Sequence, residues 1–287
     1  MANDPTPSPR RNQMAPGLYL VATPIGNLRD ISLRALDVLD GADVVLAEDT
    51  RVSGKLLAAH GLSARLERYD EHAAQRARPR ILTALAAGAR VALVSDAGTP
   101  LISDPGYRLV REAVAQGSAV YPLPGPSAVL AALAVAGLPT DRFLFAGFPP
   151  PKAVARRAWF EELAPVRATL IFFEGGPRLA ASLADMAQVF GPREAAVARE
   201  LTKLHETVVR ATLDGLAGDP RFAAPKGEIV VVVGPGAERA ATAAEADAAL
   251  TEALTRLGPA EAASEVAKAL GLSRRDLYVR ALVLRGR

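Results

Sequence analysis

Short apolar segments alternate with amphipathic helical patterns along the first half of this 287-residue chain. The predicted order is strand 18–22, helix 33–41, strand 43–47, helix 52–60, helix 79–87, strand 90–94, helix 108–116 and strand 119–123. Ser32 is suited to cap the first of these helices, and Gly41 is placed to end it. Alternation with short connections favours a mainly parallel β-sheet covered by helices, which is an α/β fold.

The proline-rich segment 122–126 interrupts this alternation and predicts a hinge between two lobes. Beyond it we expect helices 127–136, 154–163 and 179–189 and strands 142–146, 168–173, 194–199 and 228–233. The predicted organisation is a disordered tail (1–16), an N-terminal α/β lobe (17–123), a C-terminal α/β lobe (124–236), a linker (237–258) and a helical segment (259–287). The tail is polar and rich in proline, and the linker is polar and rich in alanine.

Composition argues against several classes of chemistry. The chain has no cysteine and three widely separated histidines, so we expect no disulfide, no thiolate nucleophile and no metal site. No Walker A sequence occurs, which argues against NTP hydrolysis. The most apolar later segment, 129–138, is about half as long as a membrane-spanning helix, so no membrane partner is expected. The lack of cysteine fits a cytoplasmic location.

The C-terminal segment combines a helical pattern with positive charge. A helix is predicted over 259–270, a turn at Gly271 and Leu272, and a second helix capped by Ser273. From residue 259 onward, six lysines and arginines stand against three acidic residues. Arg274, Arg275 and Arg280 decorate the second helix, which favours a helix-turn-helix that binds nucleic acid. The alternative is a small pair of helices that stabilises or dimerises the protein.

Loops at the carboxyl ends of strands carry ligands in open α/β sheets. Three such loops occur in the first lobe, at residues 23–28, 48–51 and 95–106. The third is long and rich in glycine and proline, so it is either an elaborate turn or a ligand-binding loop. Ser127 lies in a Gly-Pro-Ser-Ala sequence that lacks the second glycine of a nucleophile elbow, and we expect it to cap a helix at a ligand-binding turn.

Several ordered motifs together resemble one protein family. They are Thr23-Pro24-Ile25-Gly26-Asn27-Leu28, Ala47-Glu48-Asp49-Thr50-Arg51, residues 94–102, Leu123-Pro124-Gly125-Pro126, Gly137-Leu138-Pro139, Asp141-Arg142-Phe143, residues 198–203 and Lys226-Gly227-Glu228. From about Gly17 to the C-terminus the chain resembles the tetrapyrrole-methylase superfamily, and within it the small-subunit (16S) ribosomal RNA cytidine 2′-O-methyltransferases. Two positions depart from the usual pattern, Ala73 in place of asparagine and Pro177 in place of a histidine found in some relatives.

This resemblance implies a two-lobed tetrapyrrole-methylase-like fold that binds S-adenosylmethionine in the cleft between its lobes. The implied cofactor-binding residues are Pro24, Asp96, Ala97, Gly98, Leu101, Ile102, Ser127, Ala128, Glu174, Leu201 and Glu228. Small residues let the backbone approach a ligand, and carboxylates suit a sulfonium. The implied partners are 16S ribosomal RNA in the small ribosomal subunit and a second copy of the chain in a homodimer.

Methyl transfer to a ribose hydroxyl requires alignment of the reacting atoms and loss of the hydroxyl proton. Asp49 is the first candidate for the base, although it is also placed to cap a helix or pair with Arg51. Lys203 is the second, either as a base with a lowered pKa or as a phosphate clamp. Candidate RNA-binding residues are Arg51, His72, Lys152, Arg156, Arg157, Arg178, Arg274, Arg275 and Arg280, with Phe148 also available to stack on a base.

Two alternative functions remain at this stage. One is methylation of a tetrapyrrole carbon in cobalamin or sirohaem precursors, which the wider superfamily performs. The other is a non-enzymatic nucleic-acid-binding protein on an inactive scaffold.

Overall fold

The computed structural model describes residues 14–103, 105–236 and 242–285. The chain divides into two compact units, residues 1–235 and 236–287, and each is described by itself. Unit 1 contains two α/β lobes and unit 2 is helical. This confirms the predicted α/β fold with two lobes and a C-terminal helical segment.

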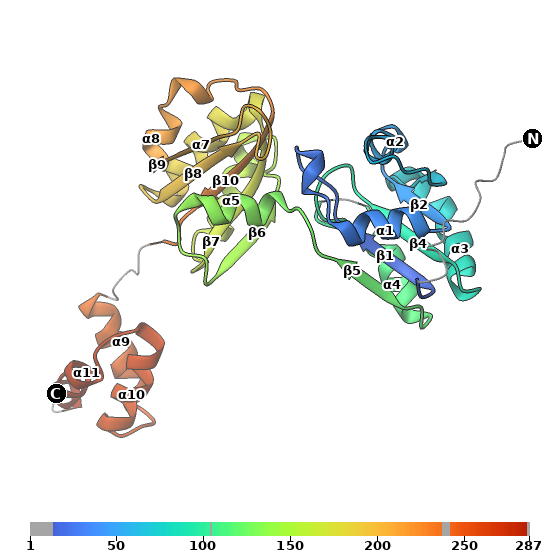
Figure 1. The fold of residues 1–287 in the computed structure, drawn as a ribbon. Coiled ribbons are helices and arrows are strands. Elements are labelled where there is room, and N and C mark those ends of the chain that lie inside the picture. Colours follow the sequence, from blue (N-terminus) through green and yellow to red (C-terminus); the bar gives the residue numbers. More distant parts are fainter. Residues whose placement is uncertain (1–13, 104, 237–241, 286–287) are drawn as a thin grey trace, which may run out of the picture. The chain divides into compact units, whose positions relative to one another are not determined.

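The first lobe is a parallel sheet between two layers of helices (Figure 1). Its strands are β1 (Gly17–Val21), β2 (Val44–Ala47), β3 (Leu66–Arg68), β4 (Arg90–Val94) and β5 (Val120–Leu123), in the order β3-β2-β4-β1-β5. Helices α1 (Leu33–Gly41) and α2 (Thr50–Ala59) pack on one face, and α3 (Glu71–Ala86) and α4 (Tyr107–Ala115) on the other. The short 3-10 helix η2 (Leu28–Asp30) precedes α1.

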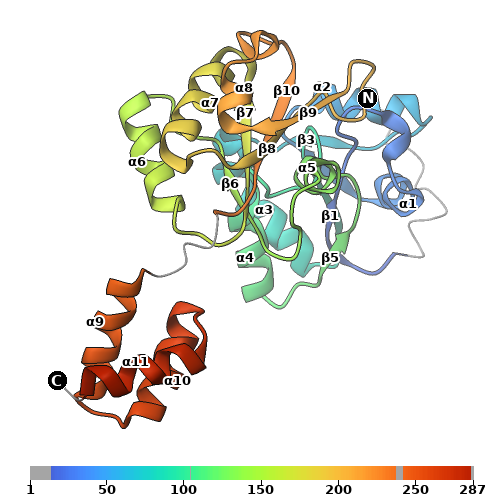
Figure 2. The same ribbon diagram turned by 90° about the vertical axis from the view of Figure 1, so that its left-hand side faces the viewer.

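The second lobe is a mixed sheet of order β6-β7-β10-β8-β9. Its strands are β6 (Phe143–Gly147), β7 (Thr169–Gly175), β8 (Glu194–Arg199), β9 (Thr207–Thr212) and β10 (Glu228–Val233). Helix α5 (Ala128–Ala136) covers one face, while α6 (Ala153–Leu163), α7 (Gly176–Phe190), α8 (Leu213–Ala217) and the 3-10 helix η3 (Pro220–Phe222) cover the other (Figure 2). Only β6 and β7 pair in parallel, so this sheet is mainly antiparallel. The mainly parallel sheet predicted from the first half of the chain is confirmed in the first lobe.

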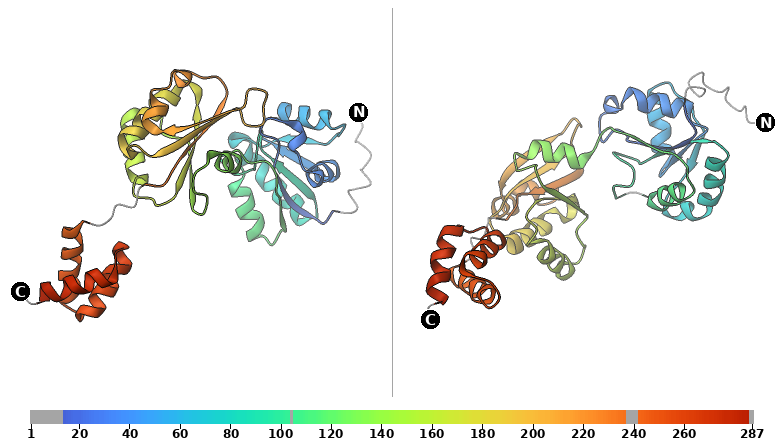
Figure 3. Two further views of the ribbon diagram at one scale, coloured as in Figure 1. Left: turned by 60° about the vertical axis from the view of Figure 1, so that its left-hand side comes forward. Right: turned by 90° about the horizontal axis from the view of Figure 1, so that it is seen from below.

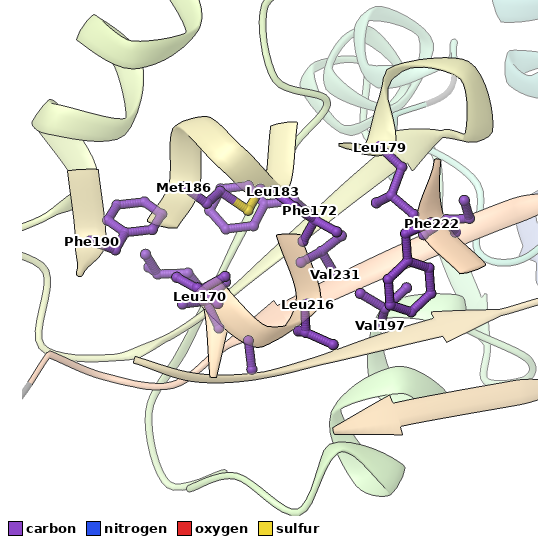
Figure 4. Close-up of a cluster of buried hydrophobic side chains, with 14 of the residues drawn as sticks. Leu170, Phe172, Leu179, Leu183, Met186, Phe190, Val197, Leu216, Phe222 and Val231 are labelled. Atoms are coloured by element: carbon purple, nitrogen blue, oxygen red, sulfur yellow. The ribbon is translucent and has the colours of Figure 1, made fainter. Parts of the chain in front are cut away.

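The larger core of the second lobe is built from aromatic and aliphatic side chains of β7, β10, α6 and α7 (Figure 4). Phe172 of β7 is fully buried and packs edge to face against Phe160, with ring centroids 5.6 Å apart. Phe190 closes the same cluster from the end of α7, and Trp159 flanks it. These rings fix α6 and α7 on the sheet, and the sheet in turn holds the loops that reach the candidate site.

Unit 2 consists of α9 (Ala243–Leu254), α10 (Pro259–Leu270) and α11 (Arg274–Arg285), which share one apolar core (Figure 3). The turn between α10 and α11 uses Gly271 in the left-handed region (φ 67°), as the predicted helix-turn-helix requires. The predicted linker at 237–258 is wrong for residues 243–254, which form α9. Alanine is a strong helix former, and Ala246, Leu250 and Ala253 recur at helical spacing and are buried.

Other sequence predictions differ at element ends. Residues 1–13 of the predicted tail lie outside the described residues, whereas Met14 and Ala15 accept hydrogen bonds from Arg90 and Tyr19 of the first lobe. Helix α3 begins at Glu71, eight residues before the predicted start, because Asp70 caps it and Pro79 is accommodated inside it. Strands β3 and β9 were not predicted, and both are edge strands without a buried residue.

Truncation of Phe172 to alanine should lower the free energy of unfolding of the second lobe by about 3–5 kcal/mol, because a fully buried ring leaves a cavity. The single tryptophan, Trp159, flanks the same core, so its fluorescence during urea unfolding measures the loss. Leu204→Ala at a site that is 92% exposed is the control, with an expected change within about 0.5 kcal/mol. Equal effects of the two variants would contradict the assigned core.

Candidate active site

Loops at the carboxyl ends of β1 and β4 are joined to each other. Thr23 and Gly98 form a two-way backbone bridge with N···O distances of 2.9 and 3.0 Å. The Thr23 hydroxyl also donates to the Ser95 carbonyl at 3.0 Å, and Thr99 donates to the Pro126 carbonyl at 3.2 Å. The predicted ligand loop is therefore held from both sides, by the loop after β1 and by the hinge. Ser127 caps α5, as predicted.

The first lobe meets the second through Gly26. A Cβ atom at this position would lie 2.4 Å from Lys203 Cγ, 2.7 Å from Thr202 Oγ1 and 2.8 Å from the Leu201 carbonyl oxygen, so only glycine allows the approach. The backbone N–H of Asn27 donates to Thr202 Oγ1 at 3.1 Å. Glu200 and Thr202 adopt the left-handed region (φ 53° and 66°), which is costly for residues with a side chain. This contact sets the loop after β8 beside the loop after β1.

A first cavity of about 460 Å³ opens between the loops of the two lobes. Its lining residues are Ile25, Glu48, Asp96, Ala97, Gly98, Thr99, Ile102, Ser103, Ser127, Ala128, Val129, Phe148, Phe173, Glu174, Gly175, Ala198, Leu201, Gly227, Glu228, Ile229 and Val230. The volume lies within the range of about 300–1,000 Å³ that small-molecule sites occupy.

A second cavity of about 400 Å³ adjoins the first. Its lining residues are Thr23, Pro24, Ile25, Gly26, Leu28, Val52, Ser53, Lys55, Leu56, Ser95, Asp96, Ala97, Lys203 and Glu228. The two cavities share Ile25, Asp96, Ala97 and Glu228. Asp96 is thus exposed to both spaces, and its carboxylate also accepts a hydrogen bond from the Asp49 backbone N–H at 3.0 Å.

Most residues expected to bind a cofactor are brought together by the fold. Those that line the first cavity are Asp96, Ala97, Gly98, Ile102, Ser127, Ala128, Glu174, Leu201 and Glu228. Pro24 lines the second cavity instead. Leu101 lines neither, because its left-handed backbone (φ 76°) directs the side chain against Gly106 and the core of the first lobe.

Glu174 contributes less polar surface to the first cavity than expected. It is 3% exposed, and its carboxylate accepts hydrogen bonds from the Gly175 N–H at 2.8 Å and from the Ser182 hydroxyl, and pairs with Arg178 at 2.8 Å. With its oxygens engaged inside the lobe, Glu174 shapes the wall.

Asp49 caps a helix and pairs with Arg51, which is the alternative to catalysis that the sequence offered. It caps α2 by accepting from the Arg51 N–H at 2.9 Å, and it pairs with the Arg51 guanidinium at 2.6 Å. These hydrogen bonds hold the pKa of the Asp49 carboxyl well below its usual range. A carboxylate with so low a pKa is a weak base, so the geometry argues against Asp49 as the proton acceptor.

Lys203 is a fixed cation. Its Nζ lies 2.8 Å from Glu200 Oε1 and 2.9 Å from Glu228 Oε2. Burial acts to lower the pKa of Lys203, but the hydrogen bonds to the two glutamates outweigh it and hold the pKa above its ordinary value. The expectation of a base with a lowered pKa is therefore wrong, and a role in positioning remains.

Glu48 is the site residue that sequence reasoning passed over. It directly follows β2, is partly buried and lines the first cavity. Burial, and then the negative charges of neighbouring aspartates of which Asp96 is foremost, raise the pKa of the Glu48 carboxyl above its ordinary value. Among the described residues its carboxylate has no hydrogen-bond or ion-pair partner. Its position directly after a strand could have marked Glu48 as a site residue from the sequence, but Asp49 lies after the same strand, so position alone did not distinguish the two.

Several predicted RNA contacts are used inside the protein. Arg156 is 4% exposed and pairs with Asp185 at 2.6 Å, while Arg157 pairs with the same carboxylate at 3.1 Å. Arg178 pairs with Glu174. Arg280 forms a bidentate pair with Asp247 of α9. The burial and bonding of Arg156 argue against a phosphate contact there, and Arg280 joins two helices of unit 2.

The remaining basic candidates are exposed. His72, Lys152, Arg274 and Arg275 are exposed at helix starts, and the Arg51 side chain is 86% exposed although it pairs with Asp49. Phe148 is 54% exposed at the first cavity and packs edge to face on Phe173. Residues 14–103, 105–236 and 242–285 contain no helix that could cross a membrane and no His, Cys, Asp or Glu cluster that could hold a metal ion.

The loops at the strand ends of the two lobes thus line two adjoining cavities of small-molecule size. Comparison with known proteins places a chain with this arrangement among methyltransferases. The family of Tetrapyrrole (Corrin/Porphyrin) Methylases matches residues 17–217, and the RsmI C-terminal HTH domain matches residues 240–285. A uroporphyrin-III-C-methyltransferase from Thermus thermophilus has the same fold, with a TM-score of 0.54 and 23% identity over 76% of this chain and 93% of that one. A diphthine synthase has a TM-score of 0.56 and 18% identity, over 76% and 89%.

Full-length relatives narrow the assignment. Ribosomal RNA small subunit methyltransferase I of Mesorhizobium japonicum is 52% identical over 95% of this chain and 93% of its own length. The protein of that name from Erythrobacter litoralis is 53% identical over 95% and 96%. The chain belongs to the ribosomal RNA small subunit methyltransferase I family, within the tetrapyrrole methylases. It is a methyltransferase.

The sequence resemblance implies S-adenosylmethionine as the ligand of the first cavity. Substitution of Gly26 by alanine should weaken its binding about tenfold, or ~1.4 kcal/mol, because the new Cβ forces the loops of the two lobes apart. Calorimetric titration measures the dissociation constant. Gly54→Ala is the matched control, since a Cβ there meets only Leu66 Cδ1 at 3.6 Å, an ordinary contact. Equal affinities of the two variants would show that the Gly26 contact does not shape the cavity.

Proposed function

We propose that this chain transfers a methyl group from S-adenosylmethionine to the 2′-hydroxyl of a cytidine in 16S ribosomal RNA. The observation that carries the proposal is the first cavity, which gathers nine of the eleven residues implied to bind the cofactor. The names of the full-length relatives support a small-subunit RNA as the acceptor. We further propose a cytoplasmic homodimer, as the resemblance implies.

The residues around the first cavity fit a ligand with an apolar body and a positive centre. Gly98, Ala97 and Ala128 leave room for close approach of the ligand to the backbone, and Ile25 and Ile229 supply apolar walls. Glu48, Asp96 and Glu228 provide negative charge in the same space. When bound, S-adenosylmethionine supplies an electrophilic methyl group on a sulfonium.

We assign the proton acceptor to Glu48. Transfer to a ribose hydroxyl forms an oxygen–carbon bond, and the hydroxyl proton must pass to a base. The Glu48 carboxylate lies in the first cavity, has no partner in the described part of the chain, and its raised pKa makes it a stronger base than an exposed glutamate. Asp49 holds α2 in place beside it, and Arg51 keeps the Asp49 carboxylate engaged.

Incubation of the protein with methyl-labelled S-adenosylmethionine and small ribosomal subunits from cells that lack this methyltransferase tests the proposed function. Label should enter 16S RNA and, after nuclease digestion, appear in 2′-O-methylcytidine. Parallel reactions with a tetrapyrrole precursor test carbon methylation, which the shared fold with uroporphyrin-III-C-methyltransferase raises. Label in the tetrapyrrole, or no transfer to RNA, would overturn the proposal.

Glu48→Gln should lower kcat about 10²- to 10⁴-fold while S-adenosylmethionine still binds, because the amide cannot accept the proton. For the wild type, the rate should rise with pH as Glu48 loses its proton, and the raised pKa places this rise at a higher pH than an exposed glutamate would give. The residual rate of Glu48→Gln should not show this step.

Asp49→Asn is the matched comparison, since it removes one carboxylate from the adjacent position. It removes the charge that pairs with Arg51 but keeps a side-chain oxygen that can cap α2, so it should cost little stability and reduce kcat no more than a few-fold. Rapid-quench rates across a pH series measure both variants. A large loss in Asp49→Asn with a small loss in Glu48→Gln would return the base to Asp49.

A further inference from the structure

The second cavity has a wall that the first does not share. Residues Val52, Ser53, Lys55 and Leu56 of α2 form one side, and the loop after β1 with Lys203 forms another. Its volume of about 400 Å³ is within the range of small-molecule sites. Because Asp96 and Ala97 line both spaces, a group in the second cavity can meet a ligand in the first across this partition.

A buried polar group in this wall lacks a partner. Ser53 is 4% exposed, and its hydroxyl forms no hydrogen bond with any residue that the structure describes. A serine inside a helix commonly donates to the carbonyl four residues earlier, but here the Asp49 carbonyl accepts from the backbone N–H groups of Ser53 and Val52. The Ser53 hydroxyl oxygen is not among the fully enclosed unpaired atoms of the described residues, so the second cavity gives access to it and it is available to a polar ligand there.

Positive charge lies along the same helix. Lys55 lines the cavity, is exposed and has no partner among the described residues. Arg51 lies one turn earlier on α2, and its Asp49 pair uses Nε and Nη2, which leaves Nη1 free of any described partner. Lys203 is already neutralised by Glu200 and Glu228. The cations available to a ligand are thus those of α2, and they suit phosphates on either side of a nucleoside.

We propose that the second cavity holds the acceptor nucleotide of the RNA, with its ribose and base against Ser53 and Val52 and its phosphates at Arg51 and Lys55. This inference rests on the proposed function and deepens it, because it separates the space for the acceptor from the space for the methyl donor. The nucleotide must leave the RNA stack to enter a cavity of this size, so the preferred acceptor is an unpaired or extruded nucleotide.

Val52→Trp tests the proposal, because Val52 lines only the second cavity and is 40% exposed, so an indole there fills the space without disturbing a core. S-adenosylmethionine should bind with wild-type affinity by calorimetry. The KM for small ribosomal subunits should rise at least about tenfold, and filter binding of the subunits should weaken in parallel. Val114→Trp on α4, at a residue 59% exposed and outside both cavities, is the control and should match the wild type.

Ser53→Ala is a second test of the proposal. It removes only the hydroxyl group and does not fill the second cavity. It should raise the KM for the subunits several-fold, because one hydrogen bond to the acceptor nucleotide is lost. Thermal stability should not fall. Loss of S-adenosylmethionine binding in Val52→Trp would assign the second cavity to the methyl donor and overturn the proposal. Subunit kinetics equal to those of Val114→Trp would also overturn it. In both cases methylation of RNA by the wild type would leave the proposed function standing.

Discussion

The site depends on the contact between Gly26 and the loop after β8. A side chain at Gly26 would collide with Leu201, Thr202 and Lys203, so the absence of a Cβ allows the loop after β1 to reach the second lobe. Thr202 completes the contact by accepting from Asn27, and Glu200 and Lys203 tie the same loop to Glu228. Left-handed backbone at Glu200 and Thr202 is stabilised by these bonds.

Charge is divided between the two sides of the site. The carboxylates of Asp96 and Glu228 line both cavities, and Glu48 adds a further negative group in the first alone, where a sulfonium is proposed to bind. Positive groups of α2 lie at the second cavity, where an RNA phosphate is proposed. This separation favours a cationic donor in one space and an anionic acceptor in the other, and Asp96 stands between them.

Local chemistry made much of the fold predictable. Ser32 and Ser127 cap the helices they were expected to cap, and Gly271 ends α10 in the left-handed conformation. Edge strand β9 was missed because it alternates short apolar and polar stretches and is mostly exposed, so it lacks the apolar run of a buried strand. Residues 243–254 were assigned to a linker because the buried face of α9 is made largely of alanines, which composition alone does not distinguish from a polar spacer.

The roles of several candidate residues depend on contacts in the folded protein that the sequence does not reveal. Glu48 and Asp49 follow the same strand, and only the fold shows that Asp49 caps α2 while Glu48 lies in the first cavity. Arg156 looks like a surface cation in sequence, yet Asp185, 29 residues away, holds it inside the second lobe. Spacing along the chain predicts helix faces, but it does not predict such long-range pairs.

The central claim is that the methyl donor occupies the first cavity and leaves the second for the acceptor. A crystal structure of the protein with S-adenosylhomocysteine measures this directly. The account predicts ligand density against Asp96, Ala97, Gly98 and Glu228, with the space beside Ser53 and Val52 free of the ligand. Density for the ligand along α2 at Ser53 and Lys55 would contradict it.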